Sequence, residues 1–269
     1  DLDFVRNIIT KDFDHFVDRD FHSNKKEPLQ GHLANLKGTE WRNMRTKLTP
    51  TFTSGKMKMM FQVMAECQND LLKKMHEEWL KNKPIDIKDV LARFTTNIIG
   101  SCAFGLDCKA LEDDNSEFRD CGKQIFDETK FETFKRHFAM TFPNITTFFN
   151  IWTIRKHVAD FILNIVENTI EYREKNNTNR NDFLQLMIKL KNNPPTNPGE
   201  HDGKPLTLGE VASQCFVFFA AGFETSSTLM SFALYELAKH QDIQEKLRVE
   251  INSVLDKHDK QVTYESIQD

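Results

Sequence analysis

A helical pattern that runs without a breaker from Thr207 to about Lys239 constrains this chain more than any other feature. Thr207 and Glu210, three residues later, form a capping box, and Leu206 with Val211 adds a hydrophobic staple. At 1.5 Å per residue such a helix is about 50 Å long, enough to cross a large domain. We therefore expect a mainly α-helical fold built around one long central helix.

The stretch AAGFETSS, residues 220–227, places a glycine, a carboxylate and three hydroxyls in the middle of this apolar helix. Glycine there costs about 1 kcal/mol relative to alanine, and an unpaired buried carboxylate costs more. Ala221, Gly222 and Thr225 share a face with little side-chain bulk. Glu224 could pair with a distant basic residue or relay protons to the Thr225 hydroxyl. Two interpretations stay open: a flat partner approaches this face, or another helix crosses at Gly222 while the hydroxyls bond to backbone carbonyls.

A second segment, residues 38–58, places Trp41 and Arg45 four positions apart on one face of a short helix. Indole and guanidinium groups are both hydrogen-bond donors, so the pair suits a ligand that carries carboxylates. A surface cation–π pair is the alternative interpretation. Together the two segments describe a flat group with acidic substituents beside a helix face of small residues.

Helical periodicity dominates the rest of the chain, and strand alternation is scarce. The expected helices begin after Ser54 and end before Pro84, run from about Ile87 to a stop at Gly105, and cover residues 154–170. Asp242 with Glu245 predicts the cap of a last helix. The residues of that helix expected to face inward are Ile243, Leu247, Ile251, Val254 and Leu255.

Composition limits the class of protein. The net charge of −4 argues against a nucleic-acid partner. The 23 Phe against 3 Tyr and 3 Trp predict large dry volumes, either a core or an apolar ligand pocket. The five cysteines lack metal or disulfide spacing, so a reducing compartment is expected. No uninterrupted apolar run approaches the roughly 20 residues of a membrane span.

The chain is expected to form a single domain over residues 1–269. The polar segment of residues 192–205, rich in Pro, Gly and Asn, is typical of a surface connection rather than a domain boundary. The chain begins at Asp1 without methionine and stops at Asp269, directly after a predicted helix start. We therefore expect an internal fragment, truncated at both ends.

Two motifs in this order resemble those of a known family. EWRNMR, residues 40–45, is similar to a W-x-x-x-R helix, and AGFETS, residues 221–226, is similar to an A-G-x-[D/E]-T-[T/S] oxygen-activation motif. Both are motifs of the cytochrome P450 haem-thiolate monooxygenases. Flanking segments such as FTTNIIGSCAFGL, residues 94–106, resemble the insect microsomal, xenobiotic-metabolising branch. The resemblance covers nearly the whole chain in collinear order.

The resemblance implies a haem cofactor and assigns residues to it. Trp41 and Arg45 would hydrogen-bond a haem propionate. Ala221 and Gly222 would pack over the distal haem face and leave room for dioxygen. Thr225 would donate a hydrogen bond to dioxygen at the iron. These five residues are the candidate cofactor-binding set.

The resemblance also implies the chemistry. One oxygen atom of dioxygen would enter an unactivated C–H bond of an apolar small molecule, such as a xenobiotic, plant toxin, insecticide or endogenous lipid. Electrons would come from NADPH through a reductase, and the haem would carry the difficult step. Glu224 would help to deliver the protons that cleave the O–O bond. Thr225 and Glu224 are thus the candidate catalytic residues.

By the same resemblance, the floor of a substrate pocket would be formed by Val217, Phe218 and Ala221. The segment GHLANL, residues 31–36, would form its roof, with Leu33 and Leu36 as candidates. The phenylalanines between residues 126 and 149 would lie where substrates enter.

Partners and location also follow from the resemblance alone. They are an NADPH–cytochrome reductase, cytochrome b5 and the cytoplasmic face of the endoplasmic reticulum membrane, reached through an N-terminal anchor outside this chain. A basic face that docks the reductase could include Arg42, Lys47, Lys56 and Lys58. Solvated surface charge is the alternative interpretation for each of these four.

Part of the family pattern is missing from the sequence. The family's axial ligand is a cysteine in F-x-x-G-x-R-x-C-x-G, and none of the five cysteines fits this motif. The E-x-x-R helix, the N-terminal anchor and the early strands are missing too. We therefore expect the parent protein to be a monooxygenase, whereas this chain has no metal ligand of its own and is inactive by itself.

Two rival interpretations belong to other classes. A non-catalytic helical domain that binds an apolar ligand, similar to nuclear-receptor ligand domains, explains the phenylalanine content. It gives no reason for the Glu224–Thr225 pair or the Trp41–Arg45 pair. A purely structural helical scaffold explains neither observation.

Overall fold

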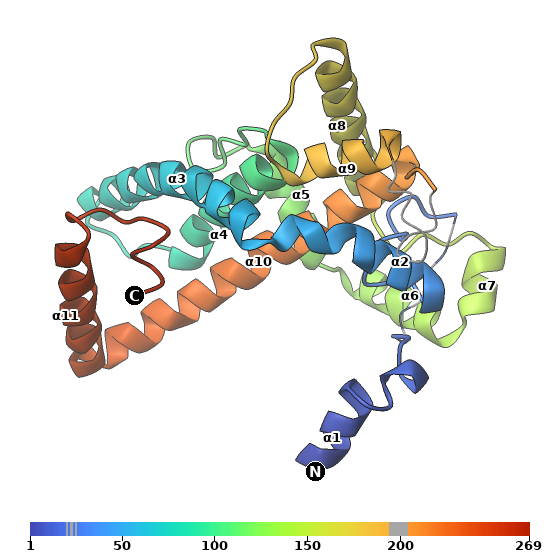
Figure 1. Cartoon of the computed structure of the whole chain (residues 1–269), viewed down its shortest axis with the longest axis horizontal. Coiled ribbons are helices and arrows are strands. Elements are labelled where there is room, and N and C mark those ends of the chain that lie inside the picture. Colours follow the sequence, from blue (N-terminus) through green and yellow to red (C-terminus); the bar gives the residue numbers. More distant parts are fainter. Residues whose placement is uncertain (20, 22–23, 25, 194–203) are drawn as a thin grey trace. The chain divides into compact units, whose positions relative to one another are not determined.

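The computed structural model describes residues 1–19, 21, 24, 26–193 and 204–269. These residues form helices and connecting loops, with no strand among them (Figure 1). The predicted mainly α-helical fold with one long helix is therefore confirmed. Most of the predicted polar connection over residues 192–205 lies outside the described residues.

The elements follow in chain order. The helices are α1 (Leu2–Ile9), α2 (Gly38–Leu48), α3 (Ser54–Leu80), α4 (Ile87–Ile99), α5 (Glu117–Phe126), α6 (Lys130–Thr141), α7 (Pro143–Phe148), α8 (Lys156–Lys175), α9 (Phe183–Asn192), α10 (Leu208–Lys239) and α11 (Gln241–Lys257). Short helical segments are η1 (Phe13–His15), η2 (Thr49–Phe52) and the π-helical turn η3 (Gly100–Phe104).

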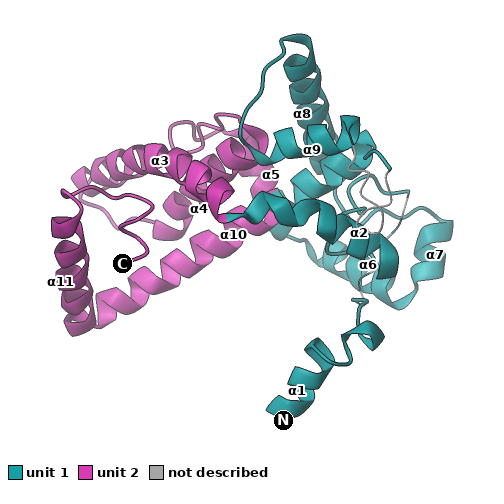
Figure 2. Ribbon diagram, viewed as in Figure 1, with its two compact units in different colours: residues 1–53, 123–218 teal, residues 54–122, 219–269 magenta. Residues whose placement is uncertain are grey.

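The chain divides into two compact units, which are described separately below (Figure 2). Unit 1 comprises residues 1–53 and 123–218, and unit 2 comprises residues 54–122 and 219–269. Helix α10 therefore contributes its first residues to unit 1 and the rest to unit 2. The single domain expected over residues 1–269 stays a prediction.

The start of α10 has the capping box that the sequence predicts. The Thr207 hydroxyl accepts the Glu210 N–H at 3.2 Å, and the Glu210 carboxylate accepts the Thr207 N–H at 2.8 Å. Leu206 and Val211 are both buried, as expected for a hydrophobic staple. Because two orphan N–H groups are satisfied in this way, the helix begins where the sequence predicts.

The core of unit 1 lies where α8, α9 and the first turns of α10 contribute their apolar faces. Ile162, Leu184 and Met187 are fully buried there. A buried ion pair joins α8 to the start of α9, with 2.7 Å between Arg173 Nη2 and Asp182 Oδ2. Asp182 also caps α9, so this carboxylate gains several hydrogen bonds that offset its desolvation.

The core of unit 2 lies among α4, η3, α5 and the unit 2 part of α10. Its largest fully buried side chains include Phe104, Phe219 and Phe223. The side chain of Asp86 caps α4 by accepting the Asp89 N–H. Gly105 ends the helical stretch in the left-handed conformation, with φ of +67°. The predicted stop at Gly105 is confirmed, because glycine adopts this conformation at little cost.

Helix α3 matches its predicted bounds, but α11 differs from its prediction. The N-cap of α11 is His240, so the predicted Asp242 cap is wrong, and Asp242 lies in the first turn instead. A carboxylate in the first turn interacts favourably with the helix dipole. Acidic residues are therefore common at this position as well as at the N-cap, which is why Asp242 was mistaken for the cap.

The predicted inward face of α11 is also wrong. Ile243, Leu247 and Ile251 are exposed, Val254 and Leu255 are only half-buried, and no residue of α11 is buried. The spacing of these residues reports an amphipathic helix. Burial also needs another element against the apolar face, and periodicity does not supply that information.

By length and composition, α10 passes the test for a membrane span, with a mean hydropathy of 1.3 over an 18-residue window. The sequence prediction considered only unbroken apolar runs, and polar residues interrupt the apolar ones within this window. The buried core helix of a large domain has the same length and hydropathy, and residues 211–216 of α10 are buried within unit 1.

Candidate functional site

The part of α10 around the segment AGFETS, residues 221–226, has one face packed into unit 2. Phe219, Phe223 and Ser227, spaced four residues apart, are fully buried. The Phe219 ring meets those of Phe104 and Phe118 edge to face, with centroids 6.2 and 5.9 Å apart. These contacts fix the rotation of the helix about its axis, because turning it would expose three buried side chains.

Gly222 lies where α10 and α4 approach each other closely. A Cβ atom on Gly222 would lie 2.7 Å from Cδ1 of Ile99 and 3.0 Å from its Cγ1. The Thr95 hydroxyl of α4 donates to the Phe223 carbonyl at 2.9 Å, close to the same contact. The glycine thus permits a helix crossing, which is one of the two interpretations that the sequence left open.

The other interpretation describes a different face of the same turn. Ala221 and Thr225 are exposed, and Leu229, one turn further, is 70% exposed. The Thr225 hydroxyl donates to the Ala221 carbonyl at 2.6 Å and keeps its lone pairs available as acceptors. This face, named the open face below, consists of Ala221, Thr225 and Leu229. It presents the small side chain of Ala221 and one hydroxyl, with Leu229 one turn further along the helix.

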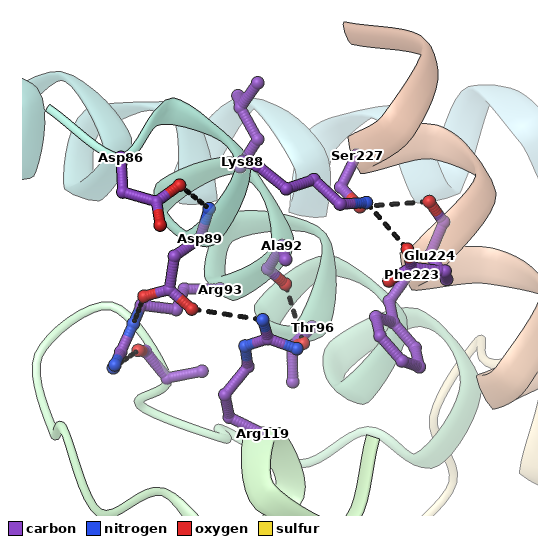
Figure 3. Close-up of polar contacts among 12 residues, drawn as sticks. Asp86, Lys88, Asp89, Ala92, Arg93, Thr96, Arg119, Phe223, Glu224 and Ser227 are labelled. Carbon is purple, nitrogen blue, oxygen red and sulfur yellow. Dashed lines mark hydrogen bonds and ion pairs between the residues drawn. The ribbon is translucent and has the colours of Figure 1, made fainter. Parts of the chain in front are cut away.

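The Glu224 carboxylate is paired with a basic residue of α4. Lys88 Nζ lies 2.7 Å from Glu224 Oε1 and also donates to Ser227 Oγ at 3.1 Å (Figure 3). Thr228 Oγ1 accepts from the same ammonium group. The ion pair is only partly screened by protein, with the Lys88 and Glu224 side chains 41% and 29% exposed. Glu224 is therefore held by charge and hydroxyls beside the open face.

Sequence reasoning did not identify Lys88. The sequence indicated only that Glu224 could pair with a distant basic residue. Spacing rules connect residues within one helix, whereas Lys88 lies 136 residues earlier in the chain. A signal for this pair would have required the packing of α4 against α10.

A second charged cluster holds the start of α4 to α5. Asp89 accepts hydrogen bonds from Arg93 Nε at 2.6 Å and Arg119 Nη2 at 3.1 Å (Figure 3). Burial of Asp89 opposes its ionisation, but these two guanidinium groups outweigh burial and hold its pKa below the ordinary value. Because Asp89 follows Lys88 directly, this cluster also fixes the helical turn that presents Lys88.

In unit 1, α2 carries the predicted Trp41 and Arg45. The half-buried Trp41 ring lies 5.8 Å from the Phe13 ring. Arg45 is exposed, and within the described ranges no side chain forms a hydrogen bond or ion pair with its guanidinium group. The N–H donors of Arg45 are thus available to an anionic ligand.

Two residues predicted to form the floor of a substrate pocket, Val217 and Phe218, belong to unit 1 and are less exposed than the residues of the open face. Val217 and Phe218 are both half-buried. The Phe218 ring stacks on Phe52 with centroids 5.4 Å apart and contacts Phe183 at 4.2 Å. Phe218 therefore contributes to an aromatic cluster of unit 1, and its contact with substrate stays a prediction.

The predicted roof segment, residues 31–36, is half-buried apart from Asn35, which is buried. Leu36 lines a cavity of about 960 Å³ in unit 1, together with Glu27, Met44 and Ser213. His32 lies against Phe216 with ring centroids 6.1 Å apart. Burial lowers the pKa of His32 to about 4, so its imidazole is neutral at physiological pH.

Two further predictions concern the surface of unit 1: phenylalanines where substrates enter, and Lys47 on a docking face. Phe131, Phe134, Phe148 and Phe149 are all more than half exposed, so this part of unit 1 presents aromatic rings to its surroundings. Lys47 is only 5% exposed and donates to the Lys204 carbonyl at 3.2 Å. Its predicted place on a docking face is therefore wrong, because a buried ammonium cannot meet a partner surface.

The remaining candidates for a docking face have intramolecular contacts of different kinds. Arg42 lies 2.7 Å from the Asp14 carboxylate, and Lys58 is paired with Glu265. Lys56 is half-buried. Solvated or locally paired charge describes these three residues, and a docking role for them stays a prediction.

None of the five cysteines, all of which lie within the described residues, forms a disulfide bond, and four of them are buried. Burial raises the pKa of Cys121 to about 12 and raises those of Cys67, Cys108 and Cys215 as well. Burial therefore disfavours the thiolate form of these four cysteines.

Comparison with known proteins identifies the family. The cytochrome P450 family model matches residues 1–269. The chain is 42% identical to Cytochrome P450 6a9 of Drosophila melanogaster over 270 residues, covering 100% of this chain and 54% of that protein. It is 40% identical to Cytochrome P450 6A1 of Musca domestica over 269 residues, covering 99% and 52%. The chain thus spans about half the length of the curated relatives that it matches. Because the family model matches from the first residue to the last, the chain belongs to the cytochrome P450 family.

Proposed function

We propose that the protein to which this chain contributes is a haem monooxygenase, which inserts one oxygen atom of dioxygen into apolar small molecules. The observation that carries this proposal is the turn of α10 around Thr225. Its packed face is fixed by Phe219 and Phe223, while Ala221 and Thr225 leave the opposite face open. On the open face a small side chain and a hydroxyl leave room beside the backbone, as a flat cofactor would need.

The described residues fit a haem group in two places, each considered within its own unit. On α2, Trp41 and Arg45 offer an indole N–H and a guanidinium that no described residue engages through its side chain, and both groups suit a propionate. On α10, Ala221 and Thr225 give a flat macrocycle room near the backbone. Gly222 contributes indirectly, because it lets Ile99 support the helix from the packed side. We propose these residues as the haem-binding set of this chain.

When bound, haem supplies the oxygen chemistry and the protein supplies binding, orientation and protons. Thr225 would hold a proton on Oγ1, which now donates to the Ala221 carbonyl, and would turn it toward the open face. Glu224 would replace that proton from solvent, since its carboxylate is partly exposed. Lys88 would keep Glu224 close to the open face through their 2.7 Å ion pair.

Substrates, partners and location are part of the proposal. The two relatives named above come from flies, and the resemblance to the xenobiotic-metabolising branch favours plant toxins and insecticides as substrates, with endogenous lipids as an alternative. Electrons would come from NADPH through a cytochrome reductase, with cytochrome b5 as a second partner. The whole protein would be anchored at the endoplasmic reticulum with its catalytic part on the cytoplasmic side.

We further propose that this chain is inactive by itself. None of its five cysteines lies in the axial-ligand motif, and burial raises the pKa of four of them. Haem-thiolate chemistry needs a cysteine thiolate on the iron, and burial disfavours the thiolate form of these four cysteines.

The test compares the whole protein with this chain alone. Each is mixed with haem, reduced and exposed to carbon monoxide. The whole protein should show a thiolate-type Soret band, and this chain should not. A thiolate-type band from the isolated chain would show that one of its cysteines is a ligand. A whole protein that shows no such band would contradict the monooxygenase proposal.

A further inference from the structure

Gln214 is a fully buried polar side chain in the second turn of α10. Its Oε1 accepts the Leu33 N–H at 2.9 Å, and its Nε2 donates to the Gly31 carbonyl at 3.0 Å. One side-chain amide thus satisfies a donor and an acceptor on the same loop backbone. This is the pairing that a neighbouring strand would offer, supplied here by a helix.

Neighbouring residues of α10 hold the same loop. The Ser213 hydroxyl donates to the Pro28 carbonyl at 2.8 Å, and the Phe216 ring lies against His32. A Cβ atom on Gly31 would lie 3.5 Å from Ser213 Oγ, so the loop backbone lies directly on the helix. Residues 28–33 are therefore attached to α10 at several successive points.

The start of this loop is fixed from a different element. Glu27 is buried and accepts the Ile154 N–H at 2.6 Å and the Thr153 N–H at 3.0 Å. The Gln30 amide donates to the Thr153 hydroxyl at 2.6 Å. Upstream of Gly31, the loop thus keeps its position without Gln214. Downstream, the Gln214 amide binds the backbone of Gly31 and Leu33 directly, while Asn35 adds a side-chain hydrogen bond to Gln30.

We propose that Gln214 is a positioning residue for substrate selection, which sets the path of residues 31–36 by binding the backbone of Gly31 and Leu33. This inference rests on the proposed function and on the predicted place of residues 31–36 as the roof of the substrate pocket. A fixed backbone in this segment presents Leu33 and Leu36 at defined positions. An apolar substrate has few polar groups to orient it, so the shape of such a wall selects the C–H bond that reacts.

The first readout is backbone hydrogen exchange in the whole protein. Gln214→Met keeps the side-chain length and removes both hydrogen bonds. Exchange of the Leu33 amide should become at least about tenfold faster, because its buried acceptor is lost. Gln185→Met is the matched control, since Gln185 accepts from Arg173 on α8 and, among the described residues, forms no hydrogen bond to the loop. It should leave Leu33 exchange unchanged. Unchanged exchange in Gln214→Met would overturn the proposal.

The second readout is the ratio of products from testosterone, a rigid apolar probe with several reactive C–H bonds. A ratio does not depend on how much of the variant folds. Gln214→Met should change the ratio at least about threefold, and Gln185→Met should not. Faster Leu33 exchange with an unchanged ratio would overturn the selection role.

A milder variant guards against a folding defect. Ser213→Ala removes the Pro28 contact together with the bond of the same hydroxyl to the Gly209 carbonyl within α10, and it leaves the Gln214 amide in place. It should shift both readouts in the same direction by a smaller amount, whereas shifts larger than those of Gln214→Met would count against Gln214 as the main contact. A whole protein that binds no haem and forms no product would contradict the proposed function itself. In that case the exchange comparison still decides whether Gln214 holds the loop.

Discussion

The two halves of α10 have the same backbone geometry and different surroundings. In unit 1, residues 211–216 are all buried, and the polar members of this run, Ser213 and Gln214, are hydrogen-bonded to loop backbone. In unit 2, burial recurs every fourth residue from Phe219, while Ala221 and Thr225 are exposed. The first half is enclosed by its unit, and the second half is packed on one face only.

This difference explains why a core helix tolerates a glycine and a carboxylate. The conformational cost of Gly222 is offset by the close approach of Ile99, and the carboxylate of Glu224 is neither deeply buried nor unpaired. The Thr225 hydroxyl donates to the Ala221 carbonyl, and the Ser227 hydroxyl donates to the Glu224 carbonyl and accepts from the Lys88 ammonium. The polar insertion thus lies where the helix changes from an enclosed environment to a half-covered one.

The largest expected effect separates the two faces of the second half. Phe223→Ala should lower the free energy of unfolding by about 3–5 kcal/mol, because a fully buried ring is lost from a packed core. Leu229→Ala on the open face is the control and should change it by less than about 1 kcal/mol, since Leu229 is 70% exposed. Urea denaturation measures both. Equal losses would show that the open face is packed after all.

A smaller effect is expected where Gly122 of α5 contacts the packed face. A Cβ atom there would lie 2.9 Å from the Phe223 ring, which is fully buried and has no room to move. Gly122→Ala should therefore cost about 1–3 kcal/mol of stability, as overpacking does. Gly55→Ala, which meets nothing within 4 Å, is the matched control and should leave stability nearly unchanged. A tolerated alanine at Gly122 would contradict the tight contact.

Beside the first half of α10, the enclosure of His32 should make the free energy of unfolding depend on pH by about 2 kcal/mol. Burial against Phe216 lowers the pKa of His32 to about 4 from an ordinary 6.5. Between these values the unfolded chain binds the proton more readily than the folded chain, so stability is lost as the pH falls. From pH 7 to pH 5 the loss should be about 2 kcal/mol.

The measurement compares this loss with that of His32→Phe, which removes the titrating group. The difference between the two proteins isolates His32, because Glu27, whose pKa is raised by burial, acts in the opposite direction in both. An equal pH dependence in the two proteins would show that His32 is not enclosed.

Local signals in the sequence predicted the helices well. Ser54 and Pro84 bracketed α3, and the Thr207–Glu210 box marked the start of α10, because caps and breakers act on their own neighbours. The inward face of α11 was wrong, since an apolar stripe does not reveal what covers it. Burial of Lys47 was missed for the same reason, as its carbonyl partner on Lys204 is 157 residues away.

The motif residues of the candidate site could be predicted from the sequence, whereas the residues that contact and position them could not. EWRNMR and AGFETS identified Trp41, Arg45, Glu224 and Thr225 by residue type and spacing. The residues that hold them, Lys88 for the carboxylate and Ile99 behind Gly222, come from α4 and carry no local signal. Residue roles toward haem and substrate remain proposals that rest on family membership and on the open face.

The central claim is that the open face of α10 handles protons through Thr225. It is tested most directly by the coupling of electron consumption to product in the whole protein. Thr225→Ala should lower the fraction of electrons recovered in product several-fold while NADPH consumption continues. Ser226→Ala, an exposed neighbour on the same turn, should leave coupling unchanged. Full coupling in Thr225→Ala would contradict the account.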